Sequence, residues 1–201
     1  MKTKHTVYAT TLALGLILLS LSPGKALAST ITFTGEITAT SCTVTGAGNA
    51  SGVGDITITL PKVGKADLDV ANSVAGYTPF QLVLGGTEGC TDGQTAAMWV
   101  ESGATTDLNP ATNNLRNHQA SGSNAEVQLI NPANGKQILL GVNEAVQNGT
   151  TVVTSSNQPA AIIADNTATL SYVAQYQNAG AKSSVTAGKV ESTLVYSIQY
   201  N

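Results

Sequence analysis

Short runs in which apolar and polar residues alternate are the feature that most restricts how this chain can fold. Alternation with a period of two places one set of side chains on each face of a β-strand and does not fit a helix. β-Branched residues are frequent in these runs, and helix formers other than Ala are scarce. The runs cover residues 31–40, 55–60, 80–84, 96–101, 126–130, 136–140, 168–177 and 189–200.

Several short strands joined by polar turns predict an all-β fold, an antiparallel β-sandwich. The Asn134-Gly135 pair between two of the runs is a hairpin signal. Residues 66–71 predict one short helical turn. Polar stretches at residues 46–54, 102–123 and 153–157 are interpreted as solvated connections at the ends of the sandwich.

Residues 1–28 have the features of a secretory signal peptide. A basic start precedes an apolar run over residues 11–20, and the small residues Ala26 and Ala28 follow it. The apolar run is too short for a membrane-spanning helix, which needs about 20 residues. Cleavage after Ala28 would leave 173 residues, a length that suits one domain.

The charge balance of the remaining chain argues against several partners. Without residues 1–28 the chain has six basic and twelve acidic residues, and it contains no basic run. Nucleic acid is therefore not expected as a partner, because binding to phosphates needs clustered Lys and Arg. Anionic membrane surfaces are not expected for the same reason.

Two cysteines, Cys42 and Cys90, remain after the signal peptide. An even number of cysteines in an exported chain predicts one disulfide bond. A reactive thiol pair or a metal site is the functional alternative, but CxxC spacing and neighbouring histidines are absent from the sequence.

The sequence does not predict an enzyme. His118 is the one histidine after the signal peptide, it lies in a polar stretch, and we interpret it as a solvated loop residue. No GxSxG motif is present, and the acidic pairs Asp67/Asp69 and Glu88/Asp92 are interpreted as surface charge. We expect no catalytic residue, metal, cofactor or small-molecule substrate.

The N-terminal run after the signal peptide has an unusual glycine. Gly35 lies in the middle of the apolar row, and glycine in a strand usually marks a place where another backbone approaches closely. An ordinary first strand of a sandwich is the alternative interpretation. The apolar row consists of Ile31, Phe33, Gly35, Ile37 and Ala39.

The C-terminal run also alternates, with Ser192 as an interruption, and it ends without a tail at Asn201. A long amphipathic strand in this position needs a partner on each edge or some other protection. Its apolar face consists of Val190, Leu194, Tyr196, Ile198 and Tyr200.

These features together resemble the pilins of chaperone–usher fimbriae, broadly those of the type 1 group, over residues 29–201. The resemblance rests on the order and spacing of several marks. They are the alternating N-terminal run with its central Gly35, Cys42 just after it, Thr78-Pro79-Phe80 ahead of Cys90, residues 172–176 (Tyr-Val-Ala-Gln-Tyr), Gly188 fourteenth from the C-terminus and the penultimate Tyr200.

The resemblance implies an incomplete immunoglobulin-like β-sandwich, completed by an N-terminal strand that the neighbouring subunit donates. A periplasmic chaperone first lends a strand to the open groove, and the exchange takes place at an outer-membrane usher. Residues 29–41 would be the donor-strand extension and residues 42–201 the pilin domain. The donated row would be Ile31, Phe33, Gly35, Ile37 and Ala39. The acceptor groove and chaperone contact would comprise Gly188, Val190, Leu194, Tyr196, Ile198, Tyr200 and Asn201.

The function implied is that of a structural subunit of an adhesive fimbrium, a homopolymer of identical subunits exported through the periplasm to the cell surface. A major shaft subunit is the first interpretation. A minor or adaptor subunit with receptor-binding loops is an alternative, and so is a secreted β-sandwich binding module that does not polymerise. A host-surface receptor is a further candidate partner.

Overall fold

A computed structural model describes residues 42–86, 89–101, 103–142, 156–180 and 185–201. The chain divides into two units, Met1–Ile37 and Thr38–Asn201, and all the described residues belong to the second unit. The expected signal peptide and donor extension lie outside the described residues. Among the residues that the structure describes, no helix is long and apolar enough to cross a membrane.

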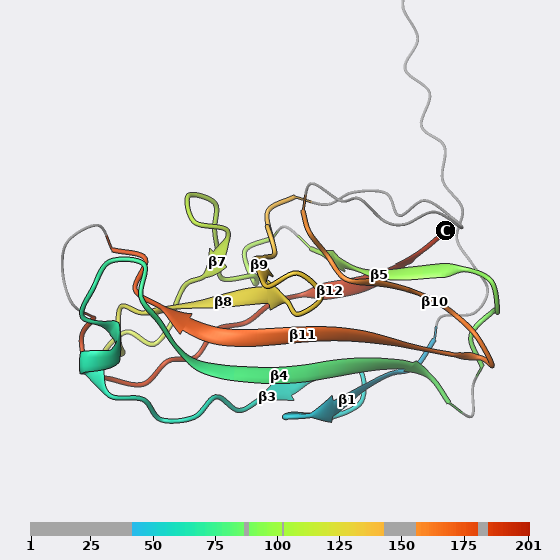
Figure 1. The fold of residues 1–201 in the computed structure, drawn as a ribbon, viewed down its shortest axis with the longest axis horizontal. Helices are drawn as coiled ribbons and strands as arrows, with labels where there is room; N and C mark the ends of the chain where they lie inside the picture. The colour runs from blue at the N-terminus through green and yellow to red at the C-terminus, as the bar shows by residue number, and fades with distance from the viewer. Residues whose placement is uncertain (1–41, 87–88, 102, 143–155, 181–184) are drawn as a thin grey trace, which may run out of the picture. The chain divides into compact units, whose positions relative to one another are not determined.

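The main sheet is antiparallel, and its strands follow the order β1-β4-β11-β8-β7-β6, with β9 paired to β8 (Figure 1). The long strands β4 and β11 form its centre, and they pair from Gly85–Thr167 to Val74–Gln177. The strands are β1 (Val44–Gly48), β4 (Val74–Gly85), β6 (Leu108–Asn109), β7 (Asn114–Leu115), β8 (Glu126–Asn131), β9 (Lys136–Gln137) and β11 (Thr167–Gln177).

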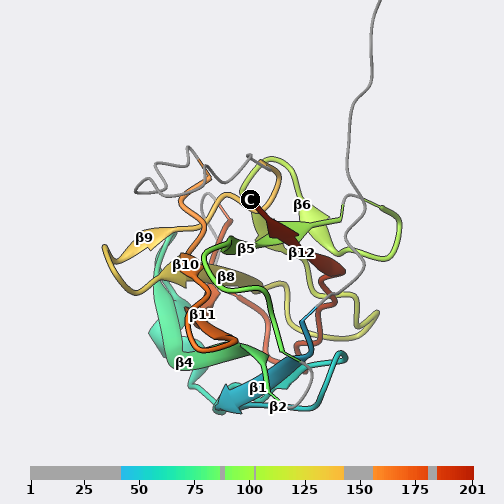
Figure 2. The ribbon, with the colours of Figure 1, turned by 90° about the vertical axis from the view of Figure 1, so that its right-hand side faces the viewer.

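A second sheet has the order β10-β5-β12 (Figure 2). β5 (Thr95–Val100) is its central strand, between β10 (Ala160–Ile162) and the last strand, β12 (Tyr196–Tyr200). A small hairpin pairs β2 (Ala50–Ser51) with β3 (Thr57–Ile58). One short 3₁₀ turn, η1 (Lys65–Leu68), replaces the helical turn expected at residues 66–71.

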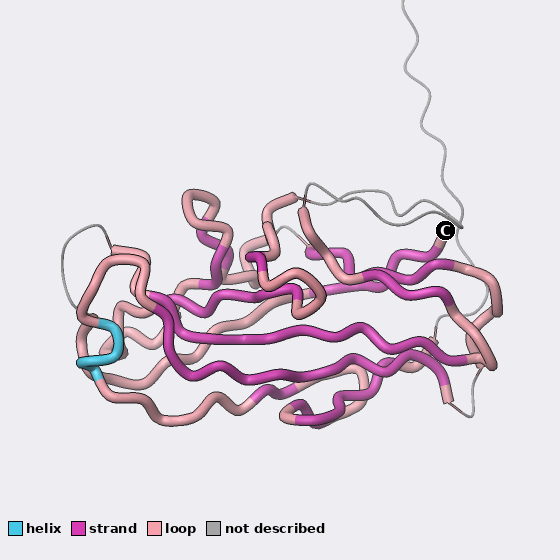
Figure 3. The backbone as a smooth tube through the Cα atoms, in the orientation of Figure 1, coloured by secondary structure: helices cyan, strands magenta, loops and turns pink. Residues whose placement is uncertain are grey.

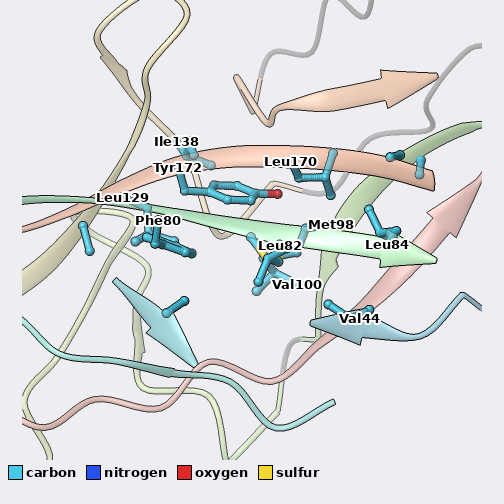
Figure 4. Close-up of a cluster of buried hydrophobic side chains, with 14 of the residues drawn as sticks. Val44, Phe80, Leu82, Leu84, Met98, Val100, Leu129, Ile138, Leu170 and Tyr172 are labelled. Atoms are coloured by element: carbon cyan, nitrogen blue, oxygen red, sulfur yellow. The ribbon is translucent and has the colours of Figure 1, made fainter. Parts of the chain in front are cut away.

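The hydrophobic core lies between the two sheets. Phe80 on β4 stacks on Tyr172 on β11, with ring centroids 5.3 Å apart. Met98 and Val100 come from β5 in the other sheet, as Figure 4 shows. Alternation along β4 explains the layout, because every second residue from Thr78 to Leu84 is buried.

The predicted disulfide bond is confirmed. Cys42 and Cys90 are bonded, with their Cα atoms 5.0 Å apart. The bond joins the start of the described chain, just before β1, to the loop after β4. The closed loop spans 48 residues.

The prediction of an all-β sandwich is confirmed, and so is the hairpin at Asn134-Gly135, which joins β8 to β9. Other boundaries were wrong. The run at residues 80–84 belongs to a strand that begins at Val74, and residues 46–54, interpreted as a loop, include most of β1 and all of β2. Small and polar residues form these strands because pairing with β4 and β3 satisfies their backbone groups.

Residues 102–123 were also expected to be a solvated connection, and this is wrong for the four residues that form strands. β6 and β7 form a hairpin that joins the main sheet beside β8, and Asn114 is fully buried there. The buried Glu126 carboxylate accepts hydrogen bonds from Thr112 Oγ1 (2.7 Å) and Asn114 Nδ2 (2.9 Å). Polar residues can be buried here because each finds a hydrogen-bond partner on a neighbouring strand.

Candidate functional site

A groove of about 540 Å³ opens between the two sheets. Two chain segments line its sides, residues 56–60, called here the N-terminal rim, and residues 190–196, called the C-terminal rim. Its floor is apolar and comes from both sheets of the sandwich. The floor residues are Phe80, Leu82, Met98, Leu115, Val127, Leu129 and Ala174.

The N-terminal rim keeps the alternation that the sequence shows. Ile56, Ile58 and Leu60 are half-buried, whereas Thr57 and Thr59 are exposed. Only β3 pairs with a neighbouring strand, and among the described residues no backbone hydrogen bond involves Thr59 or Leu60. This rim therefore presents apolar side chains to the groove with little backbone pairing of its own.

The C-terminal rim alternates in the same way. Val190, Ser192, Leu194 and Tyr196 are half-buried, and the odd-numbered residues between them are exposed. Figure 3 draws residues 189–195 as loop, because the regular strand begins only at Tyr196. The expected strand at residues 189–200 therefore shows the alternating burial of a strand from Val190 to Ile198. Only its last five residues, Tyr196–Tyr200, form a regular ladder with a neighbouring strand.

The two edges of this C-terminal segment differ in their hydrogen bonds. Glu101 N donates to Val195 O (2.9 Å), and Thr95 and Asn201 exchange both backbone bonds. Antiparallel partners alternate between bonded and non-bonded pairs, so the odd-numbered residues are those bonded to β5. The even-numbered residues from Val190 to Tyr200 direct their N–H and C=O groups to the opposite edge. Within the described chain, no strand pairs with that edge.

Two tyrosines connect this segment to the beginning of the domain. Tyr196 Oη donates to the Gly54 carbonyl (2.7 Å), and Tyr200 Oη accepts a hydrogen bond from Cys42 N (3.0 Å). Burial raises the pKa of both phenols, and the charge of Asp55 raises that of Tyr196 further. The penultimate tyrosine thereby ties the last strand to the disulfide-bonded Cys42.

Gly188 lies at a close crossing of two backbone segments. A Cβ atom at Gly188 would come within 2.7 Å of the backbone of Gly122 and Ser123, which no side chain can tolerate. Ser123 N donates to Lys189 O at the same crossing (3.0 Å). Glycine is therefore required where the C-terminal segment enters the sandwich.

The structure places the predicted acceptor residues in three positions. Val190, Leu194 and Tyr196 line the groove, and Ile198 and Tyr200 continue the same edge on β12. Gly188 and Asn201 lie at the two ends of the segment, outside the groove lining. The predicted donor residues 31–39 lie outside the described residues.

Sequence reasoning missed the N-terminal rim. The alternation at residues 55–60 was interpreted as a strand, but nothing in it indicated that Ile56, Ile58 and Leu60 face a groove. That these residues line the same groove as the C-terminal rim is visible only in three dimensions.

His118 is an exposed loop residue, as the sequence predicted, but it also contacts two carboxylates, which the sequence did not indicate. Its ring Nδ1 lies 2.8 Å from Asp107 Oδ2, its Nε2 lies 3.6 Å from Glu191 Oε1, and its side chain is 38% exposed. The hydrogen bond with Asp107 is the largest of the effects that raise the pKa of His118. Glu191 belongs to the C-terminal rim, so the histidine supports the groove from its outer side.

The fold and the groove define a class of protein, namely a β-sandwich whose last strand, β12, has a neighbouring strand on only one edge within the described chain. Comparison with known sequences gives the family. Residues 60–201 match the family model described as "Type-1 fimbrial protein, A", and the chain belongs to this family.

Two curated relatives agree with this assignment. The F17 fimbrial protein of Escherichia coli is 36% identical over 173 residues, which cover 85% of this chain and 86% of the relative. The major fimbrial subunit SMF-1 of Stenotrophomonas maltophilia is 33% identical over 172 residues, 86% of this chain and 92% of the relative. The chain is a structural subunit of a fimbrium, exported through the periplasm to the cell surface.

Solved structures with a weaker likeness include two proteins of fimbriae or pili. An antigen and type I fimbria protein of Burkholderia pseudomallei (BPSL1626) has a TM-score of 0.47 and 21% identity, over 79% of this chain and 99% of that one. The P pilus rod subunit PapA has a TM-score of 0.46 and 16% identity, over 81% and 100%.

Proposed function

We propose that the groove accepts residues 31–39 of the next copy of this chain, and that repetition of this step builds a homopolymer. The observation that carries the proposal is the edge formed by the even-numbered residues from Val190 to Tyr200, which has no strand partner within the described chain. An edge of this kind takes up an added strand through main-chain hydrogen bonds, and side-chain pockets then provide specificity.

The lengths of the two partners support the proposal. The edge from Val190 to Tyr200 spans about 36 Å, and a donated strand from Ile31 to Ala39 about 30 Å, at roughly 3.3 Å per residue. Both rims of the groove and its floor are lined by apolar side chains. The apolar row of the N-terminal segment matches this lining in chemistry and in period.

The energetics favour a long-lived joint. Burial of Ile31, Phe33 and Ile37 contributes on the order of 5–9 kcal/mol, whereas ordering the strand costs roughly 1–2 kcal/mol per residue. Direct contacts alone therefore do not make the joint durable. Completion of the receiving core adds cooperative stability, and release of the strand would require that core to open.

A subunit with an open edge needs protection before it polymerises, because unpaired edges promote aggregation. In this proposal a periplasmic chaperone lends a strand to the same groove, and an outer-membrane usher exchanges it for the next subunit. The Asn201 carboxylate serves as the chaperone's anchor. Asn201 directly follows the last strand, and its backbone is held in place by two hydrogen bonds with Thr95 on β5.

Within the fimbrium we assign this chain the role of major shaft subunit. The relative named a major fimbrial subunit, which matches over 92% of its own length, supports this assignment. A subunit that both donates and accepts a strand can occupy any position along a shaft.

The proposal includes no catalytic activity. His118 resembles one half of a catalytic pair, but both of its ring nitrogens face carboxylates, those of Asp107 and Glu191. The neighbouring Ser192 hydroxyl donates to the Arg116 carbonyl (2.8 Å) and not to the imidazole. A general base needs a nucleophile or substrate proton within hydrogen-bond reach.

The proposal is tested by replacing Gly35 with Leu in cells that also express the chaperone and usher. Polymer yield on unheated gels should fall sharply, while the soluble chaperone complex accumulates in gel filtration. Thr34→Leu is the matched control, because alternation places residue 34 on the opposite face of the strand. Loss of the chaperone complex together with the polymer would show instead that this strand belongs to its own subunit's core, where overpacking costs about 1–3 kcal/mol.

A further inference from the structure

The outer edge of the C-terminal rim is held in an unusual way. Three successive odd-numbered residues direct their backbone N–H groups to side-chain oxygens and not to carbonyls. Glu191 N donates to Asn117 Oδ1 (2.9 Å), Thr193 N to Asp107 Oδ2, and Val195 N to Thr106 Oγ1 (3.1 Å).

The carbonyls of the same residues are bonded in the ordinary manner. Glu191 O accepts from His118 N (3.0 Å), Thr193 O from Asp107 N (2.9 Å) and Val195 O from Glu101 N (2.9 Å). The supporting chain cannot run on as a regular strand here, because the Asp107 carbonyl already accepts the hydrogen bond of Arg116 N (2.7 Å). Side chains take the place of the missing strand carbonyls.

We propose that Thr106, Asp107 and Asn117, called here the support residues, are positioning residues for strand capture. They hold residues 189–195 extended before a strand arrives, so that the N–H and C=O groups of Val190, Ser192 and Leu194 already stand in line along the groove. This inference rests on the proposed function, since it assigns a role to the outer side of the same groove. A preorganised edge loses less conformational entropy on binding.

Asn117 shows how complete this support is. Its Nδ2 donates to the carbonyls of Ser123 and Lys189 (both 2.7 Å), and its Oδ1 accepts from Gln119 N (3.1 Å) in addition to Glu191 N. One side chain thus links the rim to the glycine crossing at its base. No smaller polar residue can reach all four of these groups.

Thr106 gives the cleanest substitution. Its hydroxyl is buried, donates to Glu101 O (2.8 Å) and accepts from Val195 N. Thr106→Val keeps the shape of the side chain but leaves Val195 N without an acceptor. Thr106→Ser keeps the hydroxyl and should rescue capture.

The experiment uses the mature, oxidised chain with Gly35→Leu, whose own N-terminal segment cannot donate. A fluorescent peptide with the wild-type sequence of residues 29–40 is added, and its capture is followed by anisotropy. Thr106→Val should slow capture about five- to tenfold, the equivalent of one lost hydrogen bond. Asn117→Ala, which removes two hydrogen bonds to residues 189–195, should slow it by at least as much. Thr106→Ser should stay within about twofold of the parent chain. Asn134→Ala, an asparagine in the β8–β9 turn, should also stay within about twofold.

Hydrogen exchange in the Gly35→Leu parent chain provides a readout that does not depend on substitution of the support residues. Before the peptide is added, the amides of Glu191, Thr193 and Val195 should be protected, while those of Val190, Ser192 and Leu194 exchange fast. After capture all six should be protected. Fast exchange at all six amides in the free chain would overturn the proposal.

The outcomes separate the two hypotheses. If the parent chain does not capture the peptide, the strand-accepting function itself is wrong and the inference falls with it. If the parent chain captures it and folded Thr106→Val captures it at the same rate, only the positioning role is overturned. Circular dichroism and the absence of free thiols establish that each variant is folded.

Discussion

Strand β4 and the C-terminal segment at residues 190–200 share the same alternation of apolar and polar residues, but they differ in how many of their edges are paired. On one side β4 lies between β1 and β11, and its backbone pairs along both edges. On the other side residues 190–200 pair along one edge only, and within the described chain the even-numbered residues have no strand beside them. We call these the closed side and the open side.

The difference shows that alternation specifies a face but not a partner. Side chains on the closed side are buried by their own chain, as with Leu170 at 1% exposure, whereas those of the open side are only half-buried. The open side therefore has the floor and the two rims of a groove, but no strand lies between the rims within the described chain. The following predictions test this comparison from the largest expected effect to the smallest.

Removal of the disulfide should damage both sides together. Cys42→Ser with Cys90→Ser is expected to lower the free energy of unfolding by about 4 kcal/mol, because the bond closes a 48-residue loop. The bond also holds Cys42 where its N–H meets Tyr200 on the open side. Urea denaturation of oxidised and reduced chain measures the effect. A loss below about 1 kcal/mol would contradict it.

Truncation of one leucine on each side should lower the free energy of unfolding by different amounts on the closed side and the open side. Leu170→Ala on the closed side is expected to lower the free energy of unfolding of the subunit by about 2–5 kcal/mol, because Leu170 is fully buried.

Leu194→Ala on the open side should lower it by only about 1 kcal/mol in the empty subunit. The same change should have a larger effect on the heat resistance of assembled fimbriae, because in our proposal a donated strand completes the burial of Leu194. Urea unfolding of the Gly35→Leu chain and heat dissociation of fimbriae measure the two states. Equal losses from both leucines in the empty subunit would show that the open side is already complete.

The support of the open side should depend on pH through His118. Its pKa is raised by Asp107 and Glu191, so protonation stabilises the folded chain. The stabilisation is fully present below the ordinary pKa of about 6.5 and is lost as the pH rises through the raised pKa of the folded state.

The urea midpoint of the wild type minus that of His118→Gln should therefore be largest near pH 5.5 and decline toward pH 8. Arg116, which precedes His118 by two residues, binds Asn109 Oδ1 (3.3 Å) and remains in both proteins. A difference that is constant over this range, or that grows with pH, would contradict the assignment.

The smallest effect concerns a buried hydroxyl on the closed side. Tyr172 is fully buried, burial raises its pKa, and among the described residues its Oη has no hydrogen-bond partner. An unpaired buried hydroxyl is destabilising, so Tyr172→Phe should raise the free energy of unfolding by about 1 kcal/mol or leave it unchanged. The stacking on Phe80 is retained. A loss above about 1 kcal/mol in urea denaturation would indicate that the hydroxyl has a partner after all.

The sequence by itself determined the fold class, the disulfide between Cys42 and Cys90 and the family. It also predicts a signal peptide at residues 1–28, which lie outside the described residues. These features depend on local patterns, on the pairing of two cysteines and on spacing along the chain. Alternation also identified which residues of the C-terminal run face inward, and burial in the structure follows it from Val190 to Ile198.

Only the tertiary structure decided which edge stays open and what surrounds it. The N-terminal rim at residues 56–60 and the C-terminal rim at 190–196 are far apart in the sequence, and no local signal relates them. Likewise Thr106, Asp107 and Asn117 lie in a stretch that looked like a solvated loop. Strand partners are chosen by non-local packing and by the backbone groups that remain unpaired when the chain folds, so a period of two can indicate a face but not its neighbour.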